Sequence, residues 1–497
     1  MFADTKKNIL GLPAALFILA AIVVSAQAGD AVLGQCLAAP EVAPSSLNLH
    51  AEYREGEVLV DFVDNATAAD KDAAMKKVGA VSREAISRHL GIEAFRLKPS
   101  MRVKDAEALL DQEPSVEDAE PDYAIYADQS GVELIDPHRV RGFAKKASAD
   151  PLFGLQWGLH NTGQNIGWGA GVAGIDIHAA AAWVTTTGSA AVVVGVIDTG
   201  VDYTHPDIRD NMWRNPGEIP NNGLDDDHNG YVDDVYGIDT FNHDSDPMDD
   251  NGHGTHVAGI IAARGDNGIG VAGVNWRAKI VACKCIDSKN VGSMKGAIAC
   301  LSYFYDLKVR HGVNLVLTNN SWGGHPRSSA REAAIVAHKN AGILFVAAAG
   351  NSGADNDAKP YCPASHKVDN VIAVTAVDQR GKLLPTFSYG ESTVATAAPG
   401  VRIASTYPHG RYAYMSGTSM AVPAISGMLA LYKAKSPSLT WLQLKKKLLA
   451  SGRSLPSLAG KTITGKMATI GFLPDGDGDG IPDLNDVFPQ IWLPLVL

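Results

Sequence analysis

The sequence has 497 residues, of which 46% are hydrophobic and 20% are charged. This balance supports a large buried core and about two to four domains. The net charge of -11 argues against nucleic acid as a partner, because phosphate binding requires an excess of Lys and Arg. Much of the acidic charge is clustered at Asp225–Asp250 and Asp475–Asp486, among Gly and Asn, which favours cation binding.

The N-terminus has the pattern of a secretory signal peptide over residues 1–28. A basic pair precedes the apolar run Ile9–Val24, and Ala26–Ala28 offers a cleavage site with small residues. A membrane anchor is the alternative, but Pro13 interrupts the run, which is shorter than the ~20 apolar residues of a membrane span. We therefore predict a secreted protein with no stable membrane span, and its association with the cell surface stays open.

A small α+β domain is predicted at residues 47–128. The predicted elements are a strand at Glu57–Phe62, a helix at Ala68–Val78, a strand at Glu93–Leu97, a helix at Val103–Leu110 and a strand at Asp122–Tyr126. A connector with several Lys and Arg residues follows at 129–149, and its composition is typical of an exposed, cleavable segment.

From residue 150 to residue 472 the pattern predicts an α/β domain whose mostly parallel central sheet is flanked by helices. Continuous apolar runs, typical of strands buried on both faces, alternate with helical stretches. The runs are Ala191–Ile197, Val313–Leu317 and Ile343–Ala349, and the helical stretches include Met294–Leu307 and Ala330–Asn340. In such sheets ligands bind beyond the carboxyl ends of the strands, which makes Asp198 and Asn351 candidate site residues.

Reactive side chains also occur among small residues in three short segments. They are Val196–Gly200 with Asp198, Gly252–Gly259 with His253 and His256, and Ser416–Pro423 with Ser419. Each segment alone is ambiguous. Asp-Thr-Gly also occurs in aspartic peptidases, but those need a second carboxylate that shares a proton. The histidine pair lacks the spacing and the third ligand of a zinc site.

Together, the order Asp, His, Ser with these flanking residues resembles the subtilisin-like serine peptidases, over about two-thirds of the chain. The resemblance implies that His253 is the general base for the Ser419 hydroxyl and that Asp198 holds the imidazole tautomer. It also implies that Asn351 donates to the oxyanion, whereas His256 is interpreted as structural. A helix predicted at Met420–Leu431, with a proline in its first turn, would bring backbone N–H groups to the site.

The same resemblance implies a substrate-binding strand and an opposite pocket wall. The residues are Ser321, Trp322 and Gly323 on the strand and Ala348, Ala349 and Gly350 on the wall. An extended peptide would pair with this strand by strand addition. Small residues on the wall predict room for a large apolar side chain, and the segment Lys359–Ala364 is a candidate to close the pocket.

Structural Ca²⁺ is the predicted cofactor, because oxygen donors alternate around glycine turns in several segments. The first predicted ligand set resembles an incomplete EF-hand loop and comprises Asp225, Asp227, Asn229 and Asp233. Two further sets are implied by the family resemblance: Asp239, Asn242, Asp244 and Asp246, and then Asp150, Asp207 and Asn267 with the carbonyls of Ile269 and Val271. The tail at 473–490 resembles a thrombospondin type 3 calcium repeat through Asp475, Asp477, Asp479, Asp483 and Asp486, and a short apolar end follows at 491–497.

Residues 47–128 resemble the inhibitory propeptide of the family. The chain is therefore predicted to be a secreted, calcium-stabilised serine endopeptidase, a hydrolase made as a self-processing zymogen that cleaves protein or peptide substrates through an acyl-enzyme. The alternatives are a catalytically dead, calcium-dependent surface-binding protein with the same fold, and a metallo- or aspartic hydrolase. The sequence leaves open the substrate, the cleavage preference and the pairing of Cys283, Cys285, Cys300 and Cys362.

Overall fold

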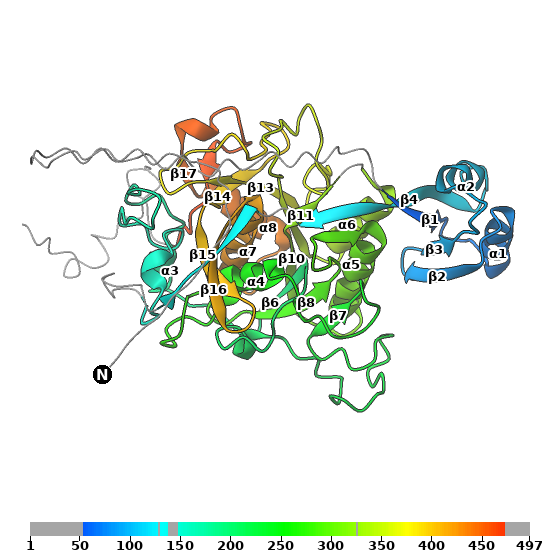
Figure 1. The fold of residues 1–497 in the computed structure, drawn as a ribbon, viewed down its shortest axis with the longest axis horizontal. Coiled ribbons are helices and arrows are strands. Elements are labelled where there is room, and N and C mark those ends of the chain that lie inside the picture. Colours follow the sequence, from blue (N-terminus) through cyan, green and yellow to red (C-terminus); the bar gives the residue numbers. More distant parts are fainter. Residues whose placement is uncertain (1–52, 128–129, 138–147, 325–326, 473–497) are drawn as a thin grey trace, which may run out of the picture. The chain divides into compact units, whose positions relative to one another are not determined.

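The computed structural model describes residues 53–127, 130–137, 148–324 and 327–472 (Figure 1). The predicted signal peptide, residues 138–147 of the connector and the calcium-repeat tail lie outside the described residues, and those interpretations stay predictions.

The N-terminal part forms the α+β domain that the sequence predicts. Its strands pair antiparallel in the order β4-β1-β3-β2. A separate hydrophobic core, which includes Val60, Phe95 and Leu110, joins this sheet to its two helices. The elements are β1 (Tyr53–Phe62), α1 (Ala68–Lys77), β2 (Ser82–Ser87), β3 (Ile92–Arg96), α2 (Val103–Leu110) and β4 (Val116–Ala127). The sequence did not predict β2, in which charged residues interrupt the apolar pattern.

The main sheet has the strand order β17-β18-β14-β13-β12-β10-β6-β8-β7. All of its neighbouring strands run parallel except β17 and β18, as the sequence predicts for an α/β domain. Its strands are β6 (Val193–Asp198), β7 (Gly237–Asp239), β8 (Lys279–Lys284), β10 (Leu315–Asn320), β12 (Leu344–Ala348), β13 (Val371–Val377), β14 (Thr396–Pro399), β17 (Arg453–Ser454) and β18 (Lys466–Met467).

Helices cover both faces of this sheet, which explains why its strands are continuously apolar. In β6, Val194 and Val196 join the core that contains α4 and α7, while Val193 and Ile197 join the core that contains α5 and α6. Alternate side chains of one strand thus bury on opposite faces. Figure 1 shows α5 and α6 side by side. The helices are α3 (Ala179–Ala182), α4 (His253–Ala262), α5 (Met294–Val309), α6 (Ser329–Asn340), α7 (Thr418–Lys435) and α8 (Trp441–Ala450), with short 3-10 turns at Phe153–Leu155, Arg209–Asn211 and Pro456–Leu458.

Serine and threonine caps fix where several of these helices begin. The hydroxyl of Ser293 accepts the N–H of Gly296 at the start of α5, and the hydroxyl of Ser328 accepts the N–H of Arg331 at the start of α6. Such caps satisfy N–H groups that have no partner within the helix. The sequence placed both helices within a few residues of their observed bounds.

Short strands extend the structure beyond the main sheet. Both β9 and β11 pair with β4, and β5 pairs with β16, which also pairs with β15. These strands are β5 (Ser130–Leu134), β9 (Val291–Ser293), β11 (Trp322–Gly323), β15 (Ile403–Tyr407) and β16 (Arg411–Ser416). Strands from the N-terminal domain and the connector therefore pair with strands of the α/β domain.

The structure resolves the cysteine pairing that the sequence left open. Cys283 on β8 and Cys300 on α5 form a disulfide, while Cys285 and Cys362 are buried thiols. Burial raises the pKa of both thiols, which favours the unreactive protonated form.

Within the described residues, no helix combines the length and the apolar character that crossing a lipid bilayer requires.

Candidate active site

Asp198 and His253 form a buried hydrogen-bonded pair at the carboxyl edge of the main sheet. Asp198 is the last residue of β6, and His253 is the first residue of α4. The distance between His253 Nδ1 and Asp198 Oδ1 is 2.7 Å, and both side chains are fully buried. Because an ionised carboxylate only accepts hydrogen bonds, the contact places the imidazole proton on Nδ1. The other ring nitrogen, Nε2, is then the one that can take a proton.

The start of α4 packs tightly on the loop after β6. A methyl group on Gly254 would lie 2.0 Å from the carbonyl oxygen of Gly200, so only glycine fits at this position. The Gly254 N–H also donates to the hydroxyl of Thr199, at 2.9 Å. This close approach fixes the imidazole against the carboxylate.

Asp249 is a buried carboxylate that the sequence analysis did not identify. It accepts the N–H groups of Gly252 and Thr255, each at 2.9 Å, and the hydroxyl of Thr199, also at 2.9 Å. Burial raises its pKa. It thereby ties the loop after β6 to the first turn of α4. The available signal was an aspartate shortly before a helix start, which is typical of N-terminal capping.

Ser419 lies in the first turn of α7. Its hydroxyl donates to the carbonyl oxygen of Ser321, at 3.1 Å, and its side chain is fully buried. The α7 helix packs against α4, the helix that begins with His253. Ser321 follows Asn320, which lies opposite Ile197, the residue before Asp198, so the start of α7 lies at the same sheet edge as Asp198.

The sequence analysis placed Pro423 in the first turn of α7, and that prediction was wrong. The helix begins at Thr418, so Pro423 lies beyond its first turn. A proline there has no N–H for the carbonyl four residues earlier, which belongs to Ser419. The hydroxyl of Ser321 donates to that carbonyl instead, at 2.9 Å. This bond replaces the hydrogen bond that the proline cannot donate, and it joins Ser321 of the predicted substrate strand to Ser419.

Asn351 faces the same helix start from the loop after β12. Its Oδ1 accepts the N–H of Thr418 at 2.9 Å and the Thr418 hydroxyl at 3.2 Å. The side-chain NH₂ group, which is the donor an oxyanion needs, is therefore directed away from Thr418. The asparagine and the start of α7 lie together, as the sequence analysis expected of an oxyanion site.

His256 differs from His253 in its surroundings. Its Nε2 contacts the carbonyl oxygens of Ile403 at 3.0 Å and Ala413 at 3.1 Å, and burial lowers its pKa to about 3. A neutral, buried imidazole that links two strands supports the structural role predicted for it.

A family model described as the Subtilase family matches residues 189–466, which is more than half of the chain and includes Asp198, His253 and Ser419. The chain belongs to the subtilase family. A second model, described as the fervidolysin N-terminal prodomain, matches residues 39–122 of this subtilase.

Similar proteins include the thermophilic serine proteinase of Bacillus sp. (strain AK1), 34% identical over 380 residues, which cover 76% of this chain and 78% of that protein. Subtilisin-like protease 1 of Plasmodium vivax is 35% identical over 330 residues, 62% of this chain and 50% of that protein. The chain thus spans about half the length of the Plasmodium relative. The crystal structure of fervidolysin from Fervidobacterium pennivorans, a keratinolytic enzyme related to subtilisin, has a TM-score of 0.63 and 24% identity, over 84% of this chain and 60% of that chain, which indicates a shared fold.

The predicted substrate strand of this subtilase is already paired with an extended peptide segment. Trp322 and Gly323 of β11 lie opposite Ala127 and Tyr126 of β4. On its other side β4 pairs with β9, where Ser293 lies opposite Ala124. A strand of the N-terminal domain is therefore held between two strands next to Ser321, as an extended peptide would be.

Two prodomain carboxylates lie at helix starts of the α/β domain. Asp122 accepts the N–H of Lys295 at 2.8 Å, at the start of α5. Glu120 accepts the hydroxyl of Ser328 at 2.5 Å and the N–H of Ser329 at 3.3 Å, at the start of α6. Burial is the largest influence on both and raises the pKa of Glu120 to about 7 and that of Asp122 to about 6.

The described residues contain an acidic cluster suited to a cation, and it includes Asp227 but no other member of the first predicted calcium-ligand set. Oxygens of Glu218, Asp227 and Asp234 all lie within 4.8 Å of one another. The carboxylates of Asp225 and Asp233 instead accept backbone N–H groups. The sequence analysis missed Glu218 and Asp234, since neither fits the alternation of a calcium loop.

The other predicted calcium residues lie in two groups. Asp239 accepts the N–H of Asn242 and pairs through its backbone with Asp244, whose carboxylate accepts the N–H of Asp246. In the third set, the Asn267 side chain donates to Asp207 at 2.8 Å, and its N–H donates to Asp150 at 3.0 Å. The structure thus brings the carboxylates of Asp150 and Asp207 to Asn267, one at its N–H and one at its side chain.

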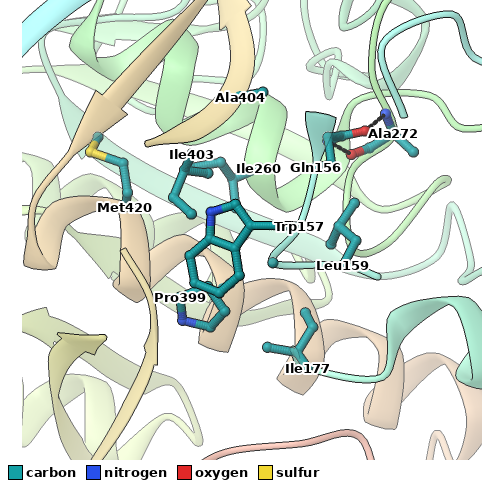
Figure 2. A pocket seen from close by; sticks show the side chains of 12 residues that line it. Gln156, Trp157, Leu159, Ile177, Ile260, Ala272, Pro399, Ile403, Ala404 and Met420 are labelled. Carbon is teal, nitrogen blue, oxygen red and sulfur yellow. Dashed lines mark hydrogen bonds between the residues drawn. The ribbon is translucent and has the colours of Figure 1, made fainter. Parts of the chain in front are cut away.

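A small cavity has a lining that includes none of Asp198, His253, Ser419 and Asn351 (Figure 2). Its volume is about 20 Å³, and Trp157, Ile260, Pro399 and Met420 are among its mostly apolar lining residues. Gln156 also lines the cavity. Its side-chain amide donates to the Ala272 carbonyl and accepts the Ala272 N–H. An apolar space of this size fits no peptide, so the cavity is a packing feature.

Proposed function

We propose that this subtilase is a secreted serine endopeptidase, made as a self-processing zymogen and stabilised by calcium. The observation that carries the proposal is the buried Asp198–His253 hydrogen bond of 2.7 Å at the sheet edge that also holds Ser419 and Asn351. A helix start rich in N–H groups and an extended strand-pairing site adjoin it. Nucleophile, base, oxyanion donors and peptide-binding edge are all supplied by this chain.

The proposed reaction is acyl transfer. The Ser419 hydroxyl attacks the scissile carbonyl carbon while Nε2 of His253 takes its proton. Asp198 stabilises the imidazolium that forms. The carbonyl oxygen becomes an oxyanion that the Asn351 amide and N–H groups at the start of α7 stabilise. His253 then protonates the leaving amine, and water, activated by the same imidazole, hydrolyses the acyl-enzyme and restores Ser419.

We predict that Ser419→Ala abolishes peptidase activity and labelling by a fluorophosphonate, because both need the nucleophilic oxygen. The substitution removes one small polar group, so far-UV circular dichroism should be unchanged. The measurement is peptide hydrolysis and labelling, with labelled Ser419 identified by mass spectrometry in the unmutated protein. Unchanged turnover in the variant would refute the assigned nucleophile, and an unlabelled, inactive unmutated protein would favour a dead binding protein.

The prodomain is proposed to inhibit the enzyme by occupying the substrate-binding edge. It covers that edge with β4, and its own hydrophobic core supports an independent fold. The chain leaves β4 at Ala127 and enters β5 at Ser130, which pairs with Ser416 just before the nucleophile. The connection between these two strands is therefore the proposed site of self-cleavage.

We predict that the mature enzyme begins between residues 128 and 130. This short connection joins β4, which pairs with β11, to β5, which pairs with β16. N-terminal sequencing of the secreted enzyme checks the position. The Ser419→Ala protein should keep its prodomain, and the separate segment 47–128 should inhibit the mature enzyme. A first residue beyond Ser130, or no inhibition by high concentrations of the segment, would contradict the proposal.

Prodomain stability is expected to depend on pH through Asp61. This residue lies opposite Asp118 in the β1–β4 pair. Burial, and then the charges of Glu117, Asp118 and Asp64, raise its pKa to about 7 from 3.8. A carboxyl whose pKa is higher in the folded state stabilises the fold fully only below the unfolded value. That stabilisation is lost as the pH rises through about 7.

We predict that Asp61→Asn stabilises the prodomain at pH 8 by about 1–2 kcal/mol, after allowing for solvent screening, and that this gain shrinks as the pH approaches 4. Hydrogen exchange of β1 and β4 in the Ser419→Ala precursor gives the measurement. Glu55→Gln, an exposed position on the same strand, is the matched control. Equal gains at both pH values, or a gain in the control, would remove Asp61 as the cause.

Calcium is proposed to bind the acidic loops between β6 and α4 and the Asp150–Asp207–Asn267 group. Support comes from the Glu218, Asp227 and Asp234 oxygens, which lie close enough to share one ion. Without a cation, these carboxylates repel one another. The calcium repeat proposed for the tail rests on its sequence pattern.

We predict that chelation lowers the melting temperature and that added calcium restores it, with about 2.7 kcal/mol of stabilisation at a hundredfold excess over Kd. Glu218→Gln should weaken the response to calcium but not abolish it, since other sites remain. Glu391→Gln, an exposed change of the same kind, should leave the response intact. Melting curves that coincide with and without chelator would end the calcium proposal.

A further inference from the structure

The two predicted walls of the substrate pocket meet the helix that carries Ser419. Strands β10 and β12 are parallel neighbours, with Asn320 opposite Ala347. The residues that follow these two strands therefore lie beside each other. The Ser321 hydroxyl bonds to the Ser419 carbonyl at 2.9 Å, and the Gly350 N–H donates to the Thr418 hydroxyl at 3.2 Å. The space between these walls is therefore where the side chain just before the scissile bond would lie.

The ring of Tyr361 lies against both walls. A methyl group on Gly323 would come within 2.3 Å of the ring, and one on Gly350 would come within 3.1 Å. The two glycines therefore make room for the Tyr361 ring. The sequence analysis expected the wall of Ala348, Ala349 and Gly350 to leave room for a large apolar side chain, and the Tyr361 ring occupies space beside Gly350. Tyr361 belongs to the segment Lys359–Ala364, the candidate to close the pocket, and it is the residue of that segment that reaches Gly323 and Gly350.

Backbone hydrogen bonds hold Tyr361 in this position. The next residue, Cys362, pairs with Gly324: the Gly324 N–H donates to the Cys362 carbonyl at 2.9 Å, and the Cys362 N–H donates back at 3.2 Å. The Tyr361 N–H donates to the hydroxyl of Ser365 at 3.0 Å, and the Ser365 N–H donates to the Tyr361 carbonyl at 2.9 Å. The ring is thus attached to a segment that is paired with the substrate strand itself.

The chain's own cleavable connection has side chains compatible with a narrow pocket. The proposed cleavage segment reads Ala127-Asp128-Gln129-Ser130 and contains no aromatic or branched aliphatic residue. This sequence feature is independent of the position of Tyr361.

We propose that Tyr361 determines specificity by narrowing the pocket, so that the enzyme cleaves after small or short polar residues and rejects aromatic and long aliphatic ones. The inference rests on the proposed peptidase function. A filled pocket discriminates by steric exclusion, because a bulky side chain enters only if the ring moves and the contacts with Gly323 and Gly350 are lost.

The test uses mature enzyme and tetrapeptide p-nitroanilides that differ only in the last residue: Ala, Ser, Asp, Leu or Phe. We expect kcat/KM to favour Ala over Phe by at least about tenfold. Tyr361→Gly should raise kcat/KM for Phe by at least about tenfold and change that for Ala by less than about threefold. Active-site titration with a fluorophosphonate normalises each preparation to the folded, active fraction.

Two further variants separate ring volume from other effects. Tyr361→Phe keeps the ring and should retain the selectivity of the unmutated enzyme. Tyr389→Ala removes another half-buried tyrosine from a neighbouring loop and should also retain it. If Tyr361→Gly does not fold, selectivity is compared in Tyr361→Ala.

Three results would overturn the inference while leaving the peptidase function intact. They are efficient cleavage after Phe by the unmutated enzyme, an unchanged ratio in Tyr361→Gly and Tyr361→Ala, and a loss of selectivity in Tyr361→Phe equal to that in Tyr361→Gly. No cleavage of any peptide together with no fluorophosphonate labelling would instead overturn the peptidase function and the inference with it.

Discussion

The hydrogen bond between His253 and Asp198 requires two segments that are far apart in the sequence to meet at one edge of the sheet. Strands β6, β10 and β12 are parallel neighbours, so their carboxyl ends lie along that edge. Asp198 ends the first, Ser321 follows the second, and Gly350 and Asn351 follow the third. The helices on both faces leave this edge as the place where polar side chains from separate loops converge. The positions of Asp198, Ser321 and Asn351 depend on this parallel arrangement.

Much of this arrangement could be predicted from the sequence, because its signals are local. The apolar runs of β6, β10 and β12 identify strands buried on both faces, and the residues beside glycines at their ends mark the site. The exceptions depend on contacts between distant residues. Strand β2 forms because β3 pairs with it. Pro423 cannot donate to the Ser419 carbonyl, and the Ser321 hydroxyl donates to that carbonyl in its place. Neither the strand pairing nor this hydrogen bond can be predicted from the local secondary-structure propensity of the sequence.

The pocket is a similar case. A small residue on a pocket wall predicts an open pocket only if no other side chain fills the space beside it. The ring of Tyr361 lies beside Gly350, and it comes from a distant segment that pairs with Gly324. In the acidic loop, the sequence pattern of alternating oxygens identified Asp227, but chain folding adds Glu218 and Asp234 from outside that alternation. The residue types were visible in the sequence, whereas their proximity was set by tertiary structure.

The loop between Asp198 and His253 links the calcium proposal to catalysis. Such a long loop costs conformational entropy when its ends are brought together. Asp249 offsets part of that entropy cost where the loop enters α4, because it accepts the N–H groups of Gly252 and Thr255. A cation bound by Glu218, Asp227 and Asp234 would restrict the same loop farther from the imidazole. Loss of the ion would then act on His253 through the conformational freedom of the loop, without any contact between the metal and this proposed catalytic residue. Stability should therefore respond to calcium before the proposed chemistry of Asp198, His253 and Ser419 does.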